Sequence, residues 1–192
     1  MTQKSPTKII LDYLKTNQLN QKLQQFRQAR KKIVLTSGSF DMLHIGHARY
    51  LQKAKQHGDL LIVGVDSDQK IKARKGPDRP LIPQKERLEM LTYLRSVDLI
   101  VLKKAQQQKW QLIKTVKPDV LITIQENYTS SELKKLASYC GQVKVLKRQA
   151  TTSTSAKLRL IQIKAAKKIE IQLTKKLNST ISKAFQELKG ES

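Results

Sequence analysis

Apolar residues in this chain follow two alternating patterns, short runs of mostly apolar residues and segments with apolar residues three or four positions apart. The short runs, typical of strands, cover residues 33–35, 60–65, 99–102, 120–124 and 143–146. Between these runs, apolar residues at helical spacing predict helices over 83–96, 110–116 and 131–139. Strands joined by single helices form right-handed crossovers and a parallel sheet covered on both faces. The pattern therefore predicts a doubly wound, Rossmann-like α/β domain with a parallel sheet of about five strands.

Further helical segments flank this pattern at both ends of the chain. Residues 7–31 carry apolar side chains at near-helical spacing, and a long basic helical stretch runs from Ser153 towards Leu188. We therefore expect an N-terminal helical extension over 1–31, an α/β domain over 32–160 and a basic C-terminal helix over 161–192. Three roles are open for that last helix: packing against the N-terminal helix, supporting a homodimer, or binding a polyanion.

The segment after the first predicted strand carries the candidate chemistry. A Ser-Gly-Ser sequence at 37–39 lets the backbone turn tightly, and Asp41 can cap the helix that follows. His44 and His47 lie on one face at the mouth of that helix, with Gly46 between them. A glycine turn leading into a helix N-terminus exposes backbone amides at a positive dipole end, where imidazoles can donate to phosphate oxygens. The stretch therefore predicts a nucleotide-phosphate site.

Two later segments follow the carboxyl ends of predicted strands, the ligand-binding edge of such a sheet. A basic, poorly apolar run over 70–75 leads into Gly76–Pro80, and we expect a loop here that acts as a mobile lid over phosphates. Consecutive hydroxyl residues over 151–155 open the last helix and offer caps, amides and hydroxyl donors. Together with the first helix terminus, this second one predicts a site for several phosphate groups.

The net charge is the strongest compositional signal. Thirty-eight Lys and Arg residues against 15 Asp and Glu give +23, and the basic residues are spread over the whole chain. Such a surface attracts phosphorylated substrates and any polyanion, nucleic acid and anionic lipid included. A basic nucleic-acid-binding protein therefore stays open as an alternative function. Aromatic residues make up only 5% of the chain, too few for a platform on which single-stranded bases stack.

Other sequence features limit the class of protein and its metal chemistry. No apolar run approaches the roughly 20 residues that a membrane-spanning helix needs, and the N-terminus lacks the apolar core of a signal peptide. The single cysteine, Cys140, fits a reducing compartment, so we expect a cytoplasmic protein. His57 is the only histidine besides His44 and His47, and no third ligand at suitable spacing predicts a zinc site.

The residues that predict the phosphate site also carry a family resemblance. Gly38-Ser39-Phe40-Asp41 running into His44-Ile45-Gly46-His47 resembles the H-x-G-H signature of the cytidylyltransferase-like nucleotidyltransferases, and Thr152-Ser153-Thr154-Ser155 is similar to their second signature. The chain between them resembles the glycerol-3-phosphate cytidylyltransferase branch and, more closely, the adenylyltransferase domain of ADP-heptose synthases. That closer likeness is carried by Lys72, Lys75-Gly76, Arg79-Pro80, Pro83 and Glu86-Arg87, and the resemblance covers about residues 31–160.

The resemblance implies transfer of a nucleoside monophosphate. An acceptor phosphate on a small metabolite, such as a sugar phosphate, attacks the α-phosphorus of a nucleoside triphosphate, and pyrophosphate leaves. Adenylyl transfer from ATP is favoured over cytidylyl transfer from CTP, and Mg²⁺ is expected as the cofactor. The protein's contribution to such a reaction is alignment and charge stabilisation.

Carried over by position, the resemblance gives each group of residues a role. His44, His47, Lys72 and Lys75 are expected to act in catalysis, the lysines from the lid. Asp68, Arg79 and Arg87 are the candidates for substrate binding, and we expect no metal site built from protein ligands alone. The expected nucleotide-binding residues are Gly38, Ser39, Phe40, Gly46, Arg148, Thr152, Ser153, Thr154 and Ser155.

The chain departs from the heptose branch after the fourth predicted strand. That branch has a Gly-Gly-Asp turn there, whereas this chain has Gln125-Glu126-Asn127-Tyr128. Because the loop helps recognise base or acceptor in the relatives, the identities of both stay open. A third interpretation, kinship with class I aminoacyl-tRNA synthetases, ranks last because the chain is too short for a tRNA-reading module.

Overall fold

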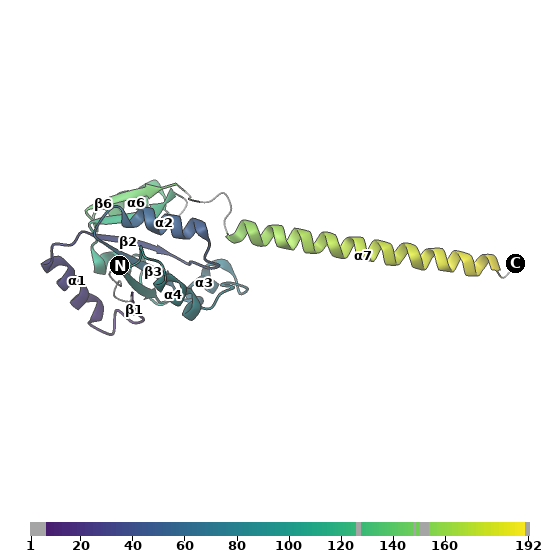
Figure 1. Cartoon of the computed structure of the whole chain (residues 1–192), viewed down its shortest axis with the longest axis horizontal. Coiled ribbons are helices and arrows are strands. Elements are labelled where there is room, and N and C mark those ends of the chain that lie inside the picture. The colour runs from purple at the N-terminus through teal and green to yellow at the C-terminus, as the bar shows by residue number, and fades with distance from the viewer. Residues whose placement is uncertain (1–6, 126–127, 148, 150–153, 191–192) are drawn as a thin grey trace. The chain divides into compact units, whose positions relative to one another are not determined.

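The structure is a computed structural model that describes residues 7–125, 128–147, 149 and 154–190 (Figure 1). The chain divides into two compact units, residues 1–150 and 151–192. The first unit contains the parallel sheet and its covering helices. The second unit is built on one long helix.

Within the described residues, the first unit has a six-stranded sheet in which every strand pair is parallel. The strand order across the sheet is β1-β4-β3-β2-β5-β6. The strands are β1 (Lys8–Ile10), β2 (Ile33–Gly38), β3 (Leu60–Asp66), β4 (Leu99–Lys103), β5 (Val120–Ile124) and β6 (Gln142–Leu146). This architecture confirms the predicted doubly wound, Rossmann-like α/β fold, with a slightly larger sheet than expected.

Helices cover both faces of the sheet. Those of the first unit are α1 (Gln18–Gln28), α2 (Ile45–Lys55), α3 (Asp68–Lys75), α4 (Gln84–Thr92), α5 (Gln111–Val116) and α6 (Ser130–Ala137). One buried cluster combines side chains of α1, α5 and α6 with the sheet, and a second cluster combines α2 and α4 with the opposite face. Along β2, Ile33 and Leu35 enter the first cluster and Val34 enters the second. This burial on two sides explains why the inner strands β2 to β5 are largely apolar.

The N-terminal segment differs from the helix predicted over residues 7–31. Residues 8–10 form β1, which pairs with β4 in the register Lys8 to Leu99, and only Gln18–Gln28 form a helix. The Thr7 hydroxyl donates to the Val97 carbonyl at 2.9 Å and fixes the start of the added strand. Adjacent Ile9 and Ile10 suit either pattern, so apolar spacing alone could not show that β4 had an open edge to pair with.

The basic segment after β3 also differs from the prediction, because residues 68–75 form helix α3 and not a loop. The Ser67 hydroxyl caps this helix by accepting the Lys70 amide at 3.2 Å, and Ile71 is buried beneath it. The helix ends at Gly76, whose φ of 98° is a conformation that glycine adopts without strain. One cap and one buried side chain are therefore enough to order a segment that is otherwise basic.

The strand order identifies the edge at which a ligand would bind. The chain leaves β2 for β3 on one side, and it later returns to place β5 on the other side of β2. A crevice forms beyond the carboxyl ends of two neighbouring strands whose connections run in opposite directions. In this protein that switch point lies at the ends of β2 and β5.

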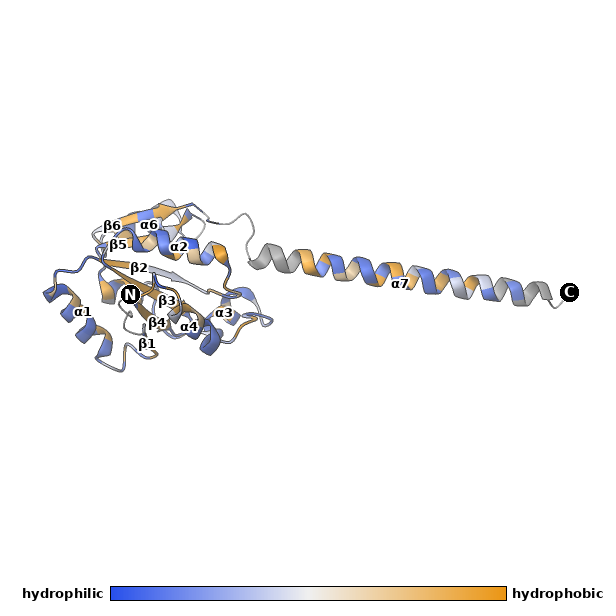
Figure 2. Cartoon of the chain, in the orientation of Figure 1, coloured by the Kyte–Doolittle hydropathy of each residue, from blue (hydrophilic) through white to orange (hydrophobic). Residues whose placement is uncertain are grey.

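The second unit contains α7 (Thr154–Gly190), a helix of 37 residues (Figure 1). It agrees with the long helical stretch that the sequence predicts. Apolar and polar residues alternate along it (Figure 2). Among the described residues, no helix has the length and apolar character needed to cross a bilayer.

Candidate functional site

The turn from β2 into α2 is a strained and closely packed loop. Phe40 and Met42 have φ values of 49° and 52°, a left-handed conformation that is uncommon for residues other than glycine. The buried Phe40 ring lies edge-on to His47, with 5.6 Å between ring centroids. A Cβ on Gly38 would lie 3.1 Å from the same ring, so glycine allows the ring to lie over the strand end. The packing therefore holds the turn in its strained shape.

The two histidines cap α2 and fix each other's hydrogen-bonding pattern. His44 is the N-cap residue, and its Nδ1 accepts the Gly46 amide at 3.1 Å. His47 Nδ1 accepts the His44 amide at 3.3 Å, and the two ring centroids are 4.1 Å apart. Since both Nδ1 atoms accept hydrogen bonds, each neutral ring carries its proton on Nε2. The N-terminus of α2 therefore presents two imidazole N–H donors beside its own backbone amides.

Asp41 does not cap α2 as the sequence predicted, because His44 takes that position. Its carboxylate instead accepts the backbone amides of Leu81 and Ile82, each at 3.1 Å, and lies 2.5 Å from Arg79 Nη2. The buried carboxylate thus ties the segment before α4 to the turn after β2. No local sequence pattern signals a contact between positions 40 residues apart.

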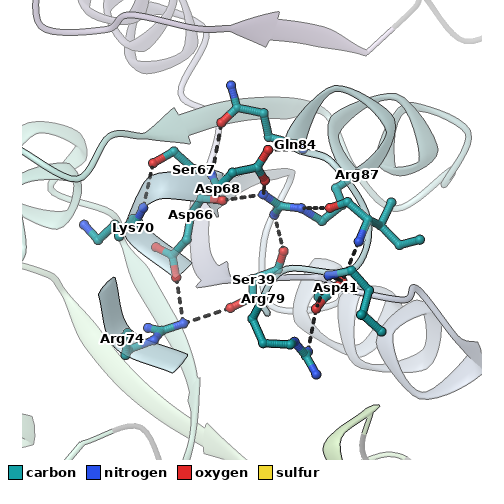
Figure 3. A network of polar contacts seen from close by, with 12 residues as sticks. Ser39, Asp41, Asp66, Ser67, Asp68, Lys70, Arg74, Arg79, Gln84 and Arg87 are labelled. Atoms are coloured by element: carbon teal, nitrogen blue, oxygen red, sulfur yellow. Dashed lines mark hydrogen bonds and ion pairs between the residues drawn. The ribbon is translucent and has the colours of Figure 1, made fainter. Parts of the chain in front are cut away.

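Arg87 lies at the centre of the polar network shown in Figure 3. Its side chain is buried, and the guanidinium donates to the carbonyls of Ser39, Ile82 and Asp66, the last two at 2.9 Å. A fourth hydrogen bond joins it to the Asp68 carboxylate at 2.8 Å. Arg87 therefore connects the turn, the end of β3 and the start of α3.

Asp68 and Gln84 extend this network between two helices. The Asp68 carboxylate accepts the Gln84 amide at 3.0 Å, and the Gln84 side chain accepts the Asp68 amide at 3.2 Å. The N-termini of α3 and α4 are thereby joined to each other. Of the three residues expected to bind substrate, Asp68 and Arg87 hold each other and the backbone, while Arg79 is paired with Asp41.

The structure adds Asp66, Arg74 and Lys103 to the residues around the turn. Asp66 is 1% exposed, and its two carboxylate oxygens each lie 3.0 Å from one cation, Arg74 or Lys103. Arg74 also donates to the Ser39 hydroxyl at 2.8 Å. One signal could have found two of them, since Asp66 and Lys103 end neighbouring parallel strands in register. Arg74 is recognised only once 68–75 is known to be a helix.

Cations are crowded on α3 beside the turn. Burial lowers the pKa of Lys75, and the nearby charges of Arg74 and Arg79 lower it further. Burial also lowers the pKa of Lys70, and the charge of Lys103 acts in the same direction. Lys72 lies exposed on the same helix. Positive charge therefore accumulates here beyond what the neighbouring carboxylates neutralise, as expected for a surface that binds an anion.

Two tyrosines lie near the switch point between β2 and β5. The Tyr50 hydroxyl bonds with the Thr36 hydroxyl at 2.8 Å and donates to the Ile122 carbonyl at 3.3 Å. Burial raises the pKa of Tyr50 to about 12. Burial also raises the pKa of Tyr128, and the carboxylates of Asp66 and Glu132 add to that rise. Both phenols therefore remain neutral at physiological pH.

Part of the predicted site falls outside the described residues. Arg148, Thr152 and Ser153 lie there, as do positions 126 and 127 of the loop after β5. Thr154 and Ser155 begin α7, and only their backbone is described. The second phosphate-binding terminus therefore stays a prediction.

Comparison with known proteins agrees with this fold. The family model described as cytidylyltransferase-like matches residues 35–183, and the chain belongs to that family. The family and the curated relatives described next support a nucleotidyltransferase, so the chain is an enzyme of that class.

Curated relatives include proteins named bifunctional protein HldE. The one from a Nitratiruptor species is 52% identical over 92 residues, which are 48% of this chain and 20% of that protein. The one from Geotalea uraniireducens is 39% identical over 140 residues, 70% of this chain and 28% of that protein. The chain therefore matches between 20% and 28% of the length of these relatives.

Two solved structures resemble this one. The lipopolysaccharide core biosynthesis protein from Thermoplasma volcanium has a TM-score of 0.51 and 29% identity, over 62% of this chain and 96% of that chain. Pantoate-beta-alanine ligase from Francisella tularensis has a TM-score of 0.51 and 15% identity, over 78% of this chain and 69% of that chain. The second likeness shows a shared fold only.

Proposed function

We propose that the protein transfers the adenylyl group of ATP to the phosphate of a sugar phosphate and releases pyrophosphate. The resemblance of residues 31–160 to the adenylyltransferase domain of ADP-heptose synthases supports ATP as the nucleotide. The identity with proteins named HldE supports a sugar phosphate as the acceptor. The observation that carries the proposal is the imidazole pair capping α2, with both Nδ1 atoms occupied by backbone amides.

In the proposed reaction, an acceptor phosphate oxygen forms a bond to the α-phosphorus of ATP while the bond to pyrophosphate breaks. Negative charge spreads over the oxygens of the five-coordinate phosphorus. The Nε2–H groups of His44 and His47 donate to those oxygens, together with the backbone amides of Ser39 and Phe40. Fixed donors at a helix N-terminus stabilise the transition state without reorganising during the reaction.

The other predicted residues have distinct roles in this proposal. Lys75 and Lys72 neutralise charge on the phosphates from α3. Arg79, whose guanidinium lies beside Asp41, binds an anionic group of the substrate through the part of its guanidinium that Asp41 leaves uncovered. Arg87 and Asp68 are positioning residues, because their hydrogen bonds hold the turn and the start of α3.

The described residues do not form a protein cage for Mg²⁺. Among them, no three His, Cys, Asp or Glu side chains are grouped closely enough to hold a metal ion. The carboxylates nearest the turn, Asp41 and Asp66, are each engaged by cationic side chains. Mg²⁺ bound by one or two ligands commonly arrives with the substrate phosphates. The catalytic and binding roles proposed above are therefore assigned to side chains and backbone amides of the protein.

The test is pyrophosphate release with each of the four nucleoside triphosphates against a panel of sugar phosphates. We expect ATP to give the highest turnover. His44→Ala and His47→Ala should each lower kcat by about 10²–10³, the usual effect of removing one donor to a developing oxyanion. His57→Ala is the matched control, since His57 lies beside Lys144 at the other end of α2. Unchanged turnover in both variants would contradict the proposal.

A further inference from the structure

The helix α7 exposes an unusual number of large aliphatic side chains. They are 44–63% exposed in the structure, and they are Leu160, Ile161, Ile163, Ile169, Ile171, Leu173, Leu177 and Ile181. The same stretch, residues 160–183, contains six lysines and one glutamate, a net charge of +5. Neither property is used by the proposed transfer reaction. A binding partner of α7 must therefore accept both aliphatic side chains and positive charge.

Most residues of the two kinds lie on different sides of the helix. Of the aliphatic residues, Leu160 and Ile171 fall between the two sides, and Ile161 falls among the lysines. At 3.6 residues per turn, Ile163, Ile169, Leu173, Leu177 and Ile181 fall within about 120° of one another, and we call them the apolar face. A second group falls within about 100° on the other side, and we call it the basic face: Lys164, Lys168, Lys175 and Lys183. Apolar and polar stretches alternate along the ribbon in Figure 2.

Lysines also lie along both borders of the apolar face. Lys167 and Lys176 fall about 40° and 20° outside its two limits. A lysine can lay its aliphatic stem along apolar surroundings while its ammonium group reaches a polar layer. Alternation of this kind, with cations at the borders of an apolar face, is typical of helices that lie in the surface of an anionic bilayer.

A second copy of α7 does not fit the apolar face. A coiled coil needs apolar residues at positions that repeat every seven residues. Here Glu170 lies seven residues from both Ile163 and Leu177, Lys176 lies seven from Ile169, and Thr180 lies seven from Leu173. Every register therefore brings polar or charged residues into the contact. Two such helices would also bring like charges within the Debye length of about 8 Å.

We propose that α7 binds an anionic lipid surface, with the apolar face in the acyl boundary and lysines among the headgroups. The helix lies on the membrane and does not cross it, because no described helix is apolar enough to span a bilayer. Nucleic acid explains the lysines but leaves the aliphatic side chains in water, since its phosphates attract cations only. This inference is independent of the proposed transfer reaction.

The test is co-sedimentation of the 192-residue chain with vesicles of phosphatidylcholine, with and without phosphatidylglycerol, at low and high salt. We expect binding to the anionic vesicles only, weakened by salt. Lys164→Gln with Lys168→Gln and Lys175→Gln should weaken it about a hundredfold, a factor of about five per lysine. The matched control, Lys53→Gln with Lys85→Gln and Lys135→Gln, removes the same charge from exposed positions of the first unit and should bind like the unmodified protein.

Two further variants separate lipid insertion from simple charge attraction. Leu173→Gln with Leu177→Gln and Ile181→Gln should abolish vesicle binding at every salt concentration, with helicity retained because glutamine is a good helix former. Glu170→Gln should tighten binding, since it removes a negative charge that lies within the apolar face, between the directions of Leu177 and Ile163. Each of three results would overturn the proposal. These are no binding to anionic vesicles at low salt, unchanged vesicle binding by the triple glutamine variant of the apolar face, and displacement of the vesicles by duplex DNA that this variant binds as tightly as the unmodified protein. Self-association abolished by that same variant, without vesicle binding, would indicate a second copy instead.

Discussion

The histidines and the buried arginine illustrate how single residues set up the candidate site. His44 and His47 use one ring nitrogen each to complete the start of α2, and that contact decides which nitrogen carries the proton. Arg87 donates four hydrogen bonds to groups from three segments. Its planar guanidinium can satisfy diverging acceptors that a lysine could not. The turn geometry therefore depends on a residue buried beneath it.

Replacing Arg87 should reduce stability and turnover together. Arg87→Met leaves the carbonyls of Ser39 and Asp66 without their donor, and we expect the free energy of unfolding to fall by about 3–5 kcal/mol. Arg87→Lys should keep more of the stability, yet kcat should fall with little change in KM, because the turn is displaced. Denaturant unfolding and steady-state kinetics measure these effects. Lys85→Met, an exposed change on the same helix, is the control, and an equal effect there would refute the role.

Lys75 predicts a particular dependence of activity on pH. Its pKa is lowered by burial and by Arg74 and Arg79, so its charge is lost at a lower pH than that of an ordinary lysine. Activity that needs this charge should fall on the alkaline side, and Lys75→Arg should move that fall to higher pH because arginine stays protonated.

Stability should respond to Lys75 in the opposite direction. The folded protein binds fewer protons than the unfolded chain between the lowered pKa and the ordinary value, so the contribution of Lys75 to stability rises with pH there. The pH profile of kcat/KM and denaturant unfolding separate the two effects. The control is Lys85→Arg, in which we expect the fall of activity at high pH to stay where it is. If that fall also stays in place in Lys75→Arg, Lys75 has no part in the mechanism.

Among the elements, α3 links the sheet to the site most directly. It starts at the end of β3, carries Arg74 and Lys75, and is joined to α4 through the paired Asp68 and Gln84. Its amphipathic signal is weak because Ile71 is its one buried residue. The helix therefore depends on its cap and on its neighbours more than on an apolar face.

Removing the cap of α3 should loosen the element and, through it, the site. Ser67→Ala removes the hydroxyl that accepts the Lys70 amide, and we expect the free energy of unfolding to fall by about 1 kcal/mol. Turnover should fall several-fold, because Arg74 would no longer be held beside Ser39. Hydrogen exchange at residues 70–75 reports local opening directly. Ser131→Ala, at an exposed serine in α6, is the matched control. Unchanged exchange would show that the cap is dispensable.

At the scale of the whole molecule, the net charge of +23 acts on encounter with the substrate. The site already contains a local excess of cations on α3, and the rest of the surface adds to the same field. Both substrates of the proposed reaction are strongly anionic. A field of one sign raises the rate at which such ligands arrive, and salt screens it.

Salt should therefore lower kcat/KM and leave kcat nearly unchanged. We expect kcat/KM to fall by about tenfold or more between low and high ionic strength, since steering of charged ligands raises association rates by about 10–10³. The chemical step occurs between groups already in contact, so screening affects it little. Steady-state kinetics over a salt series measure both constants. A parallel fall in kcat and kcat/KM would point to a disrupted site and not to steering.

The sequence determined much of the fold and the location of the chemistry. Strands buried on both sides are largely apolar, so β2 to β5 were predicted from the pattern. The edge strand β6, which is not buried on both sides, was also predicted, as was the long helix α7. The sequence also predicted that two histidines three residues apart lie on one face at the start of a helix, because local spacing decides which residues share a helix face. In each case the physical cause is local in the chain.

Only the tertiary structure decided the features that depend on contacts between distant segments. β1 forms because β4 had an open edge, and α3 is a helix because its cap and Ile71 meet the rest of the unit. Asp41 caps no helix but binds Arg79 and the backbone before α4, and Asp66 joins Arg74 and Lys103. The energy of such contacts comes from removing paired charges and backbone groups from water. That outcome is set by packing in three dimensions, which residue spacing along the chain does not encode.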